Sequence, residues 1–179
     1  MDTHPSPPAP SHNQPRTHPT PAPAPAPQPQ PQPIILSPSA ITAQPPESFP
    51  TPSPGSPGRI TNNLTWRTLL STPQTPRTAM CAGLATCPPR SGSLALHRHT
   101  QAEIYYVTAG RGVVVIEGVE HEVQRGSVLF IPGDAEHGVL NRGSEELEWF
   151  YVFPTAGFGD VVYRFEGEGA MERAEEKEG

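Results

Sequence analysis

The chain has 179 residues, a formal net charge of −6 at pH 7 and a single lysine, Lys177. Excess negative charge opposes binding to a phosphate backbone, so we expect no nucleic-acid partner. No apolar run approaches the roughly 20 residues that cross a bilayer, and the N-terminus lacks the basic and apolar regions of a signal peptide. We therefore expect a cytoplasmic protein with no membrane partner.

Residues 1–58 hold twenty of the 26 prolines and almost no aromatic residues. Proline removes a backbone donor and fixes φ, so neither a helix nor a sheet ladder can run through this segment. We predict a disordered, partly polyproline II arm that is dispensable for folding. Its one apolar patch, at residues 33–36, is either a docking tract for an SH3 or WW-type module or part of a passive extension.

Residues 59–166 form the predicted folded domain, and residues 167–179 form a predicted solvated acidic tail. Short apolar segments separated by glycine and proline turns indicate an all-β sandwich or barrel. In chain order, we expect strands at residues 60–70, 79–86, 93–99, 103–108, 113–117, 119–123, 127–131, 137–141, 147–153 and 161–165.

Three histidines and one glutamate, His97, His99, Glu103 and His137, form a candidate metal site. Side chains at positions i and i+2 of a strand share a face, so His97 and His99 project together. Glu103 begins the next strand after a short bend, and His137 follows another apolar strand. Three imidazoles and a carboxylate are a workable ligand set for one divalent transition metal, and they converge only in a nearly closed β-structure.

These residues lie in two stretches that resemble the paired motifs of the cupin superfamily. The first motif, G-x5-H-x-H-x3-E-x6-G, matches except that Ser91 stands at its leading glycine. The second, G-x5-P-x-G-x2-H-x3-N, matches except that Asp134 stands at its middle glycine. The matching positions are His97, His99, Glu103, Gly110, Gly126, Pro132, His137 and Asn141. The resemblance implies a double-stranded β-helix, or jelly-roll, and a homodimer.

The ligand set leaves one or two positions open on a six-coordinate metal. Iron(II) is the metal we expect first, because it could bind oxygen and substrate together. Manganese(II), nickel(II) or zinc(II) could act as a Lewis acid instead.

Strand alternation points Tyr105 inward with Glu103 and turns Tyr106 outward. A phenol beside a bound metal could donate a proton, or act as a base if its pKa falls, so Tyr105 and Glu103 are the candidate catalytic residues. Tyr105 could equally be a large core residue. Asn141 shares the parity of His137 and could orient a ligand, whereas Arg98 lies between two inward histidines and should point outward.

Three classes of function follow from the resemblance. The chain is similar to single-domain cupins of fungal secondary-metabolite pathways, which implies an oxidoreductase that tailors a small, oxygenated, polyketide-like metabolite. It is also similar to cupin lyases that use a tyrosine base on sulfonio-acid substrates, which implies a lyase, isomerase or decarboxylase with Tyr105 as acid or base. The third class is a non-catalytic small-molecule binder.

Overall fold

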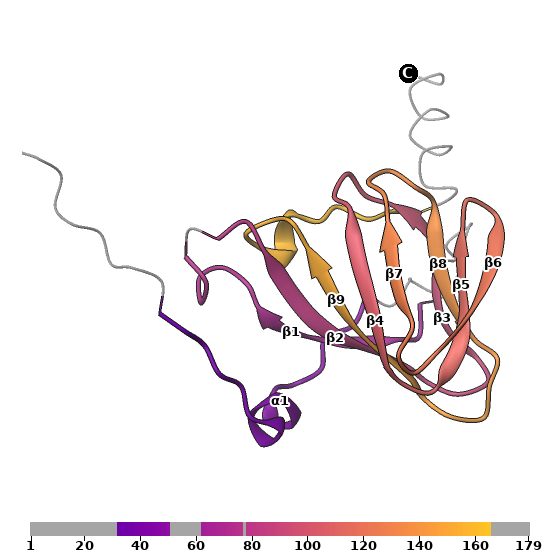
Figure 1. Ribbon diagram of the computed structural model, residues 1–179, viewed down its shortest axis with the longest axis horizontal. Coiled ribbons are helices and arrows are strands. Elements are labelled where there is room, and N and C mark those ends of the chain that lie inside the picture. Colours follow the sequence, from indigo (N-terminus) through magenta and orange to yellow (C-terminus); the bar gives the residue numbers. More distant parts are fainter. Residues whose placement is uncertain (1–31, 51–61, 77, 166–179) are drawn as a thin grey trace, which may run out of the picture. The chain divides into compact units, whose positions relative to one another are not determined.

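The computed structural model describes residues 32–50, 62–76 and 78–165, and nearly all of the regular structure in them is β-strand (Figure 1). The elements are α1 (Pro38–Ala43), β1 (Thr65–Leu70), β2 (Cys81–Cys87), β3 (Gly92–Arg98), β4 (Glu103–Ala109), β5 (Arg111–Ile116), β6 (Val119–Gln124), β7 (Val128–Ile131), β8 (His137–Asn141), β9 (Leu147–Phe153), the 3-10 helix η1 (Phe158–Asp160) and β10 (Arg164–Phe165). None of the helices in these residues is long and apolar enough to span a membrane.

The strands form two five-stranded sheets in which every neighbouring pair is antiparallel. One sheet has the order β1-β2-β9-β4-β7, and the other has the order β10-β3-β8-β5-β6. Strands that are consecutive in the chain, such as β2 and β3 or β7 and β8, lie in different sheets, as a jelly-roll requires. The all-β jelly-roll predicted from the sequence is confirmed.

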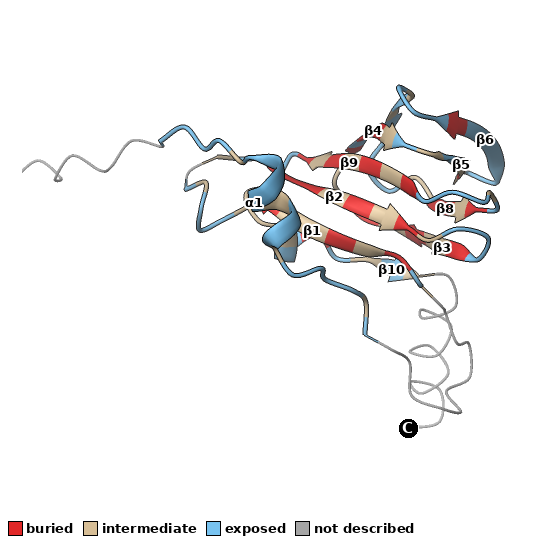
Figure 2. Ribbon diagram, turned by 90° about the horizontal axis from the view of Figure 1, so that it is seen from below, coloured by how far each residue is buried: buried red, intermediate tan, exposed pale blue. Residues whose placement is uncertain are grey.

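Alternation along the strands builds the core between the sheets. In β9, Leu147, Trp149, Tyr151 and Phe153 are buried, while the residues between them are only partly covered. Figure 2 shows the same banding of buried and partly buried residues along β2 and β9. Because each fully buried large apolar side chain contributes about 1.5–3 kcal/mol, the period-2 pattern decides which face of each strand turns inward.

Two tight turns take left-handed backbone conformations. Gly110, between β4 and β5, has φ of 73°, and a side chain there would meet the carbonyl oxygen of Glu146. Asp134, which occupies the position of the second motif's middle glycine, has φ of 61°. Aspartate tolerates this region better than most residues, so the turn before His137 keeps its shape without glycine.

Part of the segment predicted to be disordered is ordered in the structure. The helix α1 is capped by the Oγ of Ser37, which accepts a hydrogen bond from the backbone N–H of Ala40. Residues 44–49, which we call the strap, then run beside β1, and Glu47 pairs with Trp66 through an antiparallel bridge. The edge of β1 leaves backbone groups unpaired, and a non-proline residue within the arm can satisfy them. Residues 1–31 and the predicted acidic tail lie outside the described residues.

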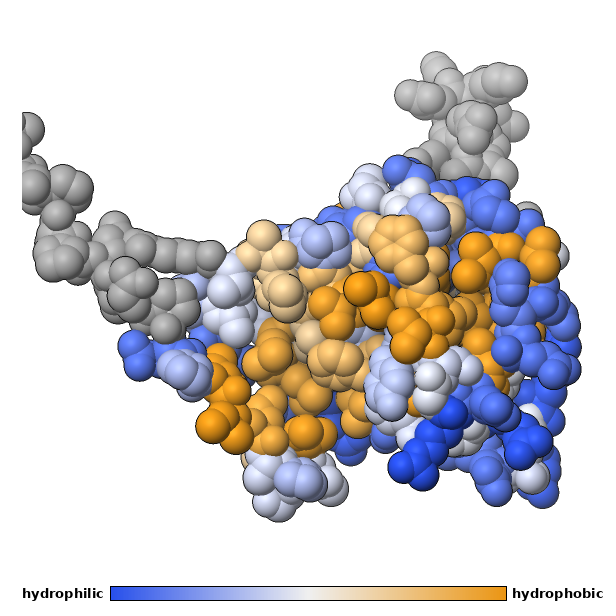
Figure 3. All heavy atoms as spheres, in the orientation of Figure 1, coloured by the Kyte–Doolittle hydropathy of each residue, from blue (hydrophilic) through white to orange (hydrophobic). Residues whose placement is uncertain are grey.

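The outer face of the first sheet carries exposed apolar side chains. Ile104 and Tyr106 on β4 are in register with Phe130 and Val128 on β7, and all four are more than 40% exposed. Figure 3 shows apolar residues gathered where β9, β4 and β7 lie in Figure 1. The homodimer that the sequence predicts stays a prediction.

Two glycines with similar backbone angles provide a test of the turn geometry. Gly118 has φ of 77°, but a side chain there would meet nothing within 4 Å. We expect Gly118→Ala to lower the free energy of unfolding by about 1–2 kcal/mol, from the left-handed conformation alone. Gly110→Ala should cost about 1–3 kcal/mol more, because it also forces a clash with Glu146. Urea unfolding would measure both, and equal losses would contradict the close approach at Gly110.

Candidate metal centre

The four predicted ligands meet at one end of the barrel. His97 lies near the end of β3, His99 follows it, Glu103 begins β4 and His137 begins β8. His97 and His137 are register partners in neighbouring strands. All four side chains are buried, with at most 2% of their surface exposed. The structure therefore brings together every residue that the sequence assigned to the metal site.

An irregularity in β3 turns His97 inward. The pairing of β3 with β8 shifts register between Leu94 and His97, so an extra residue interrupts the alternation. Without this bulge, the inward face of Leu94 would continue to Leu96 and Arg98. Arg98 instead faces outward, as predicted, and its guanidinium lies 3.1 Å from a carboxylate oxygen of Glu117.

Each of the three histidines is held by its own local backbone. The Nδ1 atom of each ring lies at hydrogen-bond distance from a carbonyl oxygen two residues away in the sequence. A carbonyl oxygen can only accept, so each Nδ1 carries a proton, and in the neutral ring the lone pair lies on Nε2. The pairs are His97 with Ala95 at 2.8 Å, His99 with Gln101 at 2.9 Å and His137 with Ala135 at 2.9 Å.

The atoms that face one another in the centre lack hydrogen-bond partners. The three Nε2 atoms and the Oε2 atom of Glu103 are all buried and unpaired. The histidine ligand atoms lie within 4.8 Å of one another, and the Glu103 Oε2 is 3.4 Å from the Nε2 atoms of His99 and His137. Unpaired buried polar atoms are costly, and converging lone pairs repel unless a cation lies between them. The residues present therefore fit a divalent cation.

The electrostatics of His97 favour the metal-binding form of the ring. Burial, followed by the neighbouring His137, lowers the pKa of His97 to about 2. The imidazole is therefore neutral at physiological pH, as a metal ligand must be. The three-histidine cluster could hold a metal ion. A set of three nitrogens and one oxygen suits iron(II), manganese(II), nickel(II) and zinc(II) alike.

A small cavity in the barrel interior reaches Glu103, and Tyr105 lines it. Its volume is about 20 Å³, and its lining includes Glu103, Tyr105 and Trp149. Tyr105 is 2% exposed, whereas Tyr106 is 47% exposed, as strand alternation predicts. Burial first, and then the carboxylate of Glu103, raise the pKa of Tyr105 well above 10; Tyr105 also forms a hydrogen bond with Glu103. Without a nearby cation, the phenol is protonated.

Sequence reasoning missed Tyr163 as a residue of the site. Its ring stacks on His97 with centroids 4.6 Å apart, and it lies 5.5 Å from the ring of His99. Burial raises the pKa of Tyr163 well above 10, followed in effect by the charge of Glu103. The signal was present in the final strand, where Tyr163 and Phe165 alternate and Phe165 pairs in register with His97.

The suggested role of Asn141 as a ligand-orienting residue is wrong. Its side-chain amide donates to the backbone carbonyls of Cys87 and Glu145, at 3.0 and 2.8 Å, and its oxygen accepts from the N–H of Gly143. Asn141 ends β8, whereas His137 begins it, so shared parity placed the two on one face but at opposite ends. Asn141 stabilises turns distant from the centre.

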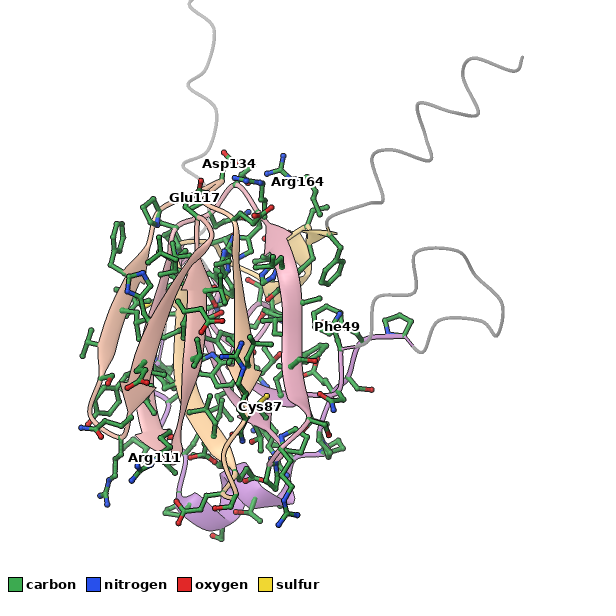
Figure 4. All side chains as sticks on the ribbon, turned by 90° about the vertical axis from the view of Figure 1, so that its right-hand side faces the viewer. Phe49, Cys87, Arg111, Glu117, Asp134 and Arg164 are labelled. Atoms are coloured by element: carbon green, nitrogen blue, oxygen red, sulfur yellow. The ribbon has the colours of Figure 1, made fainter. Side chains whose placement is uncertain are left out.

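The charged residues at this end of the barrel pair with one another outside the centre. Figure 4 shows Glu117, Asp134 and Arg164 together at one end and Arg111 at the other. Arg164 forms an ion pair with Asp134, and Arg98 donates to the Asp134 carbonyl oxygen at 2.7 Å. The Asp134 N–H donates in turn to the carbonyl oxygen of His99 at 2.7 Å. The turn before His137 is thus tied to the segment that carries the other two histidines.

Comparison with known proteins finds similarity to cupin proteins. The family model described as Cupin domain matches residues 83–153. The chain is 43% identical over 100 residues to dimethylsulfoniopropionate lyase DddW from Ruegeria pomeroyi. That alignment covers 56% of this chain and 64% of the lyase, so the chain spans less than two thirds of the relative's length.

Solved structures agree on the fold. The polyketide cyclase RemF from Streptomyces resistomycificus superposes with a TM-score of 0.58 at 21% identity, covering 74% of this chain and 86% of the cyclase. A predicted oxalate decarboxylase from Thermotoga maritima gives a TM-score of 0.54 at 25% identity, covering 68% of this chain and 99% of that protein.

Substitution of the histidines would test the metal centre. We expect His137→Ala to lower metal affinity by on the order of 100-fold or more, since even loss of a residue that only supports a ligand costs 10- to 100-fold. Glu103→Gln should also weaken binding, because it removes the negative charge of the set. The matched control is His121→Ala, on the exposed face of β6. Metal analysis after gel filtration gives the readout, and full occupancy in a His97→Ala, His137→Ala double variant would refute the site.

Proposed function

The chain belongs to the cupin superfamily, and on that premise we propose that it is a metal-dependent lyase acting on a short sulfonio-carboxylate. The observation that carries the proposal is the buried phenol of Tyr105, hydrogen-bonded to Glu103, whose Oε2 lies 3.4 Å from the unpaired Nε2 atoms of His99 and His137. The 43% identity to a dimethylsulfoniopropionate lyase supports the substrate class.

The proposed reaction needs only a base and a sink for charge. A base removes a proton from the carbon next to the carboxylate, and the electron pair forms a double bond to the next carbon. The bond from that carbon to sulfur breaks, and the sulfur leaves with its electrons. With dimethylsulfoniopropionate, the products are acrylate, dimethyl sulfide and a proton, so no oxidant or second substrate is consumed.

Tyr105 is the proposed base. Its buried phenol is protonated when no cation is near, because burial and Glu103 both disfavour the phenolate. A divalent cation on the three imidazoles would favour the phenolate, and it would also neutralise a substrate carboxylate and the charge that develops beside it. The hydrogen bond to Glu103 positions the neutral phenol before its proton leaves, because a phenolate and a carboxylate have no proton to share.

The cavity lining matches a substrate with a cationic end and an anionic end. Its residues include no lysine or arginine among those that the structure describes. Arg98 and Arg164 pair with Glu117 and Asp134 outside it. The described lining therefore offers a substrate carboxylate no side-chain cation, and this leaves that role to a bound metal. The aromatic walls suit a sulfonium group, which ring faces attract.

An oxidoreductase acting on a small polyketide-like metabolite is the second candidate. The aromatic lining and the open metal positions favour it, as the sequence predicted. A short acid needs less enlargement of the 20 Å³ cavity than a ring-sized substrate does, and the 43% identity to a lyase has no oxidoreductase counterpart among the relatives described above. A non-catalytic binder would use the same cavity without turnover.

A substitution at Tyr105 separates these functions. We expect Tyr105→Phe to lower kcat for sulfide release from dimethylsulfoniopropionate by about 100- to 10,000-fold, as loss of a general base does, while metal content stays unchanged. Tyr106→Phe, the exposed neighbour, is the matched control and should keep the full rate. Headspace gas chromatography of dimethyl sulfide gives the measurement.

The same assay run with and without oxygen decides among the classes. Release that is independent of oxygen and lost in Tyr105→Phe supports the lyase. Turnover of an aromatic or polyketide substrate that requires oxygen would replace it with the oxidoreductase. Ligand binding without turnover in the presence of any of the four metals would support the non-catalytic binding protein.

A further inference from the structure

The cavity beside Glu103 is too small for a substrate in this conformation. A volume of about 20 Å³ holds roughly one water molecule. Even a small carboxylic acid needs several times that space, so at least one wall must move when a ligand enters. The walls are Phe49, Leu64, Trp66, Ala85, Leu94, Glu103, Tyr105, Trp149, Tyr151, Phe158 and Tyr163.

Most of these walls are fixed by the sheets. The seven wall residues from Trp66 to Tyr151 in the list above lie on strands β1, β2, β3, β4 and β9. Moving them would break sheet hydrogen bonds. Leu64 directly precedes β1 and is 4% exposed. Tyr163 stacks on His97, and the N–H of Phe158 donates to the Oγ of Ser71 at 3.1 Å. Phe49 is the wall carried by the strap.

Phe49 closes the cavity by ring contacts with the barrel. Its centroid lies 4.8 Å from Trp66, 5.2 Å from Tyr163 and 5.5 Å from Phe165. The ring is partly buried, whereas Glu47 and Ser48 beside it are exposed. Figure 4 shows Phe49 on the segment that runs along the outside of the barrel. The strap thus brings one apolar ring to the site, while residues 45–48 are exposed.

A few exposed hydrogen bonds hold the strap to β1. Glu47 exchanges two backbone hydrogen bonds with Trp66, at 2.7 and 3.0 Å, and its Oε1 accepts from the N–H of Thr68 at 2.9 Å. The Nε of Arg67 donates to the carbonyl oxygen of Gln44 at 2.9 Å. Prolines at positions 45, 46 and 50 restrict the strap, so little conformational entropy is lost when it reseats.

A further unpaired polar atom, away from the metal centre, lies on Trp66 beside Phe49 of the strap. The indole Nε1 of Trp66 is buried with no hydrogen-bond partner, and Trp66 lines the cavity against Phe49. An indole N–H can only donate, so it offers a hydrogen bond to an acceptor on a bound ligand. Buried donors without partners are rare in folded proteins, and this one sits next to the movable wall.

From these observations we infer that the strap is a lid over the metal pocket and that Phe49 sets the size of ligand that the closed pocket accepts. The strap lies outside residues 83–153, which match the family model. Access through the lid does not depend on the reaction. The consequence for substrate size rests on the proposed function.

The two tryptophans of the chain report on the lid directly, because both line the cavity. In a Trp149→Phe background, Trp66 is the only indole and lies against Phe49. We expect Phe49→Ala to increase acrylamide quenching of Trp66 at least 2-fold and Phe49→Leu to give an intermediate value. Phe130→Ala, an exposed phenylalanine on β7, is the matched control and should change nothing. Circular dichroism confirms folding, and Phe49→Leu keeps the test valid if Phe49→Ala unfolds.

Metal exchange gives a second readout without turnover. In zinc-loaded protein, transfer of zinc to excess 4-(2-pyridylazo)resorcinol requires the chelator or the metal to pass the lid. We expect Phe49→Ala to accelerate this transfer about 10-fold, and Phe130→Ala to leave it unchanged. Unchanged quenching together with unchanged transfer in both Phe49 variants would overturn the lid.

Substrate range tests the size-setting role of Phe49. Phe49→Ala should raise kcat/KM for diethylsulfoniopropionate relative to the dimethyl compound by about 10-fold or more, since each methylene in a pocket changes selectivity on that order. An unchanged ratio would refute this role. If the unaltered protein cleaves neither compound, the proposed lyase function is refuted. The quenching and zinc-transfer experiments would still test whether the strap is a lid.

Discussion

The hydrogen bond from each histidine Nδ1 to a nearby carbonyl is the constraint on which the centre depends. It fixes the tautomer of His97, His99 and His137, and so it directs three lone pairs to one point. The bulge in β3 serves the same end, because it turns both His97 and its acceptor carbonyl at Ala95 into place. The jelly-roll brings the three histidines together, and hydrogen bonds to the local backbone orient their rings.

The candidate metal centre buries polar atoms without hydrogen-bond partners, which is unfavourable elsewhere in the barrel. Four buried polar atoms meet there without partners, whereas the layer around them consists of aromatic and aliphatic side chains. A structure tolerates such a conflict where the surrounding packing fixes the groups and a ligand relieves it. The aromatic contacts of His97 with Tyr163 and of His99 with Phe153 provide that packing.

The fold and the convergence of the three histidines with Glu103 could be predicted because both rest on local patterns. Period-2 alternation gave the inward faces of Glu103 and Tyr105, and motif spacing gave the histidines. What escaped prediction depends on contacts between distant segments. Phe49 lies in a proline-rich stretch whose composition indicates disorder, and its ring packs against residues distant in the sequence: Trp66, Tyr163 and Phe165. The expectation for Asn141 failed for another reason. Strand parity shows that Asn141 and His137 share a face of β8, but it does not show that they lie at opposite ends of the strand.

The strap also covers part of the edge strand β1, which would otherwise be free to pair with other molecules. β1 is an edge strand, and a free edge is a template for another chain. The strap pairs with it at one bridge, while prolines at 45, 46 and 50 prevent it from extending into a full strand that could itself recruit a neighbour. Self-association by strand addition at β1 must therefore compete with a segment of the same polypeptide, at the high local concentration that covalent linkage ensures.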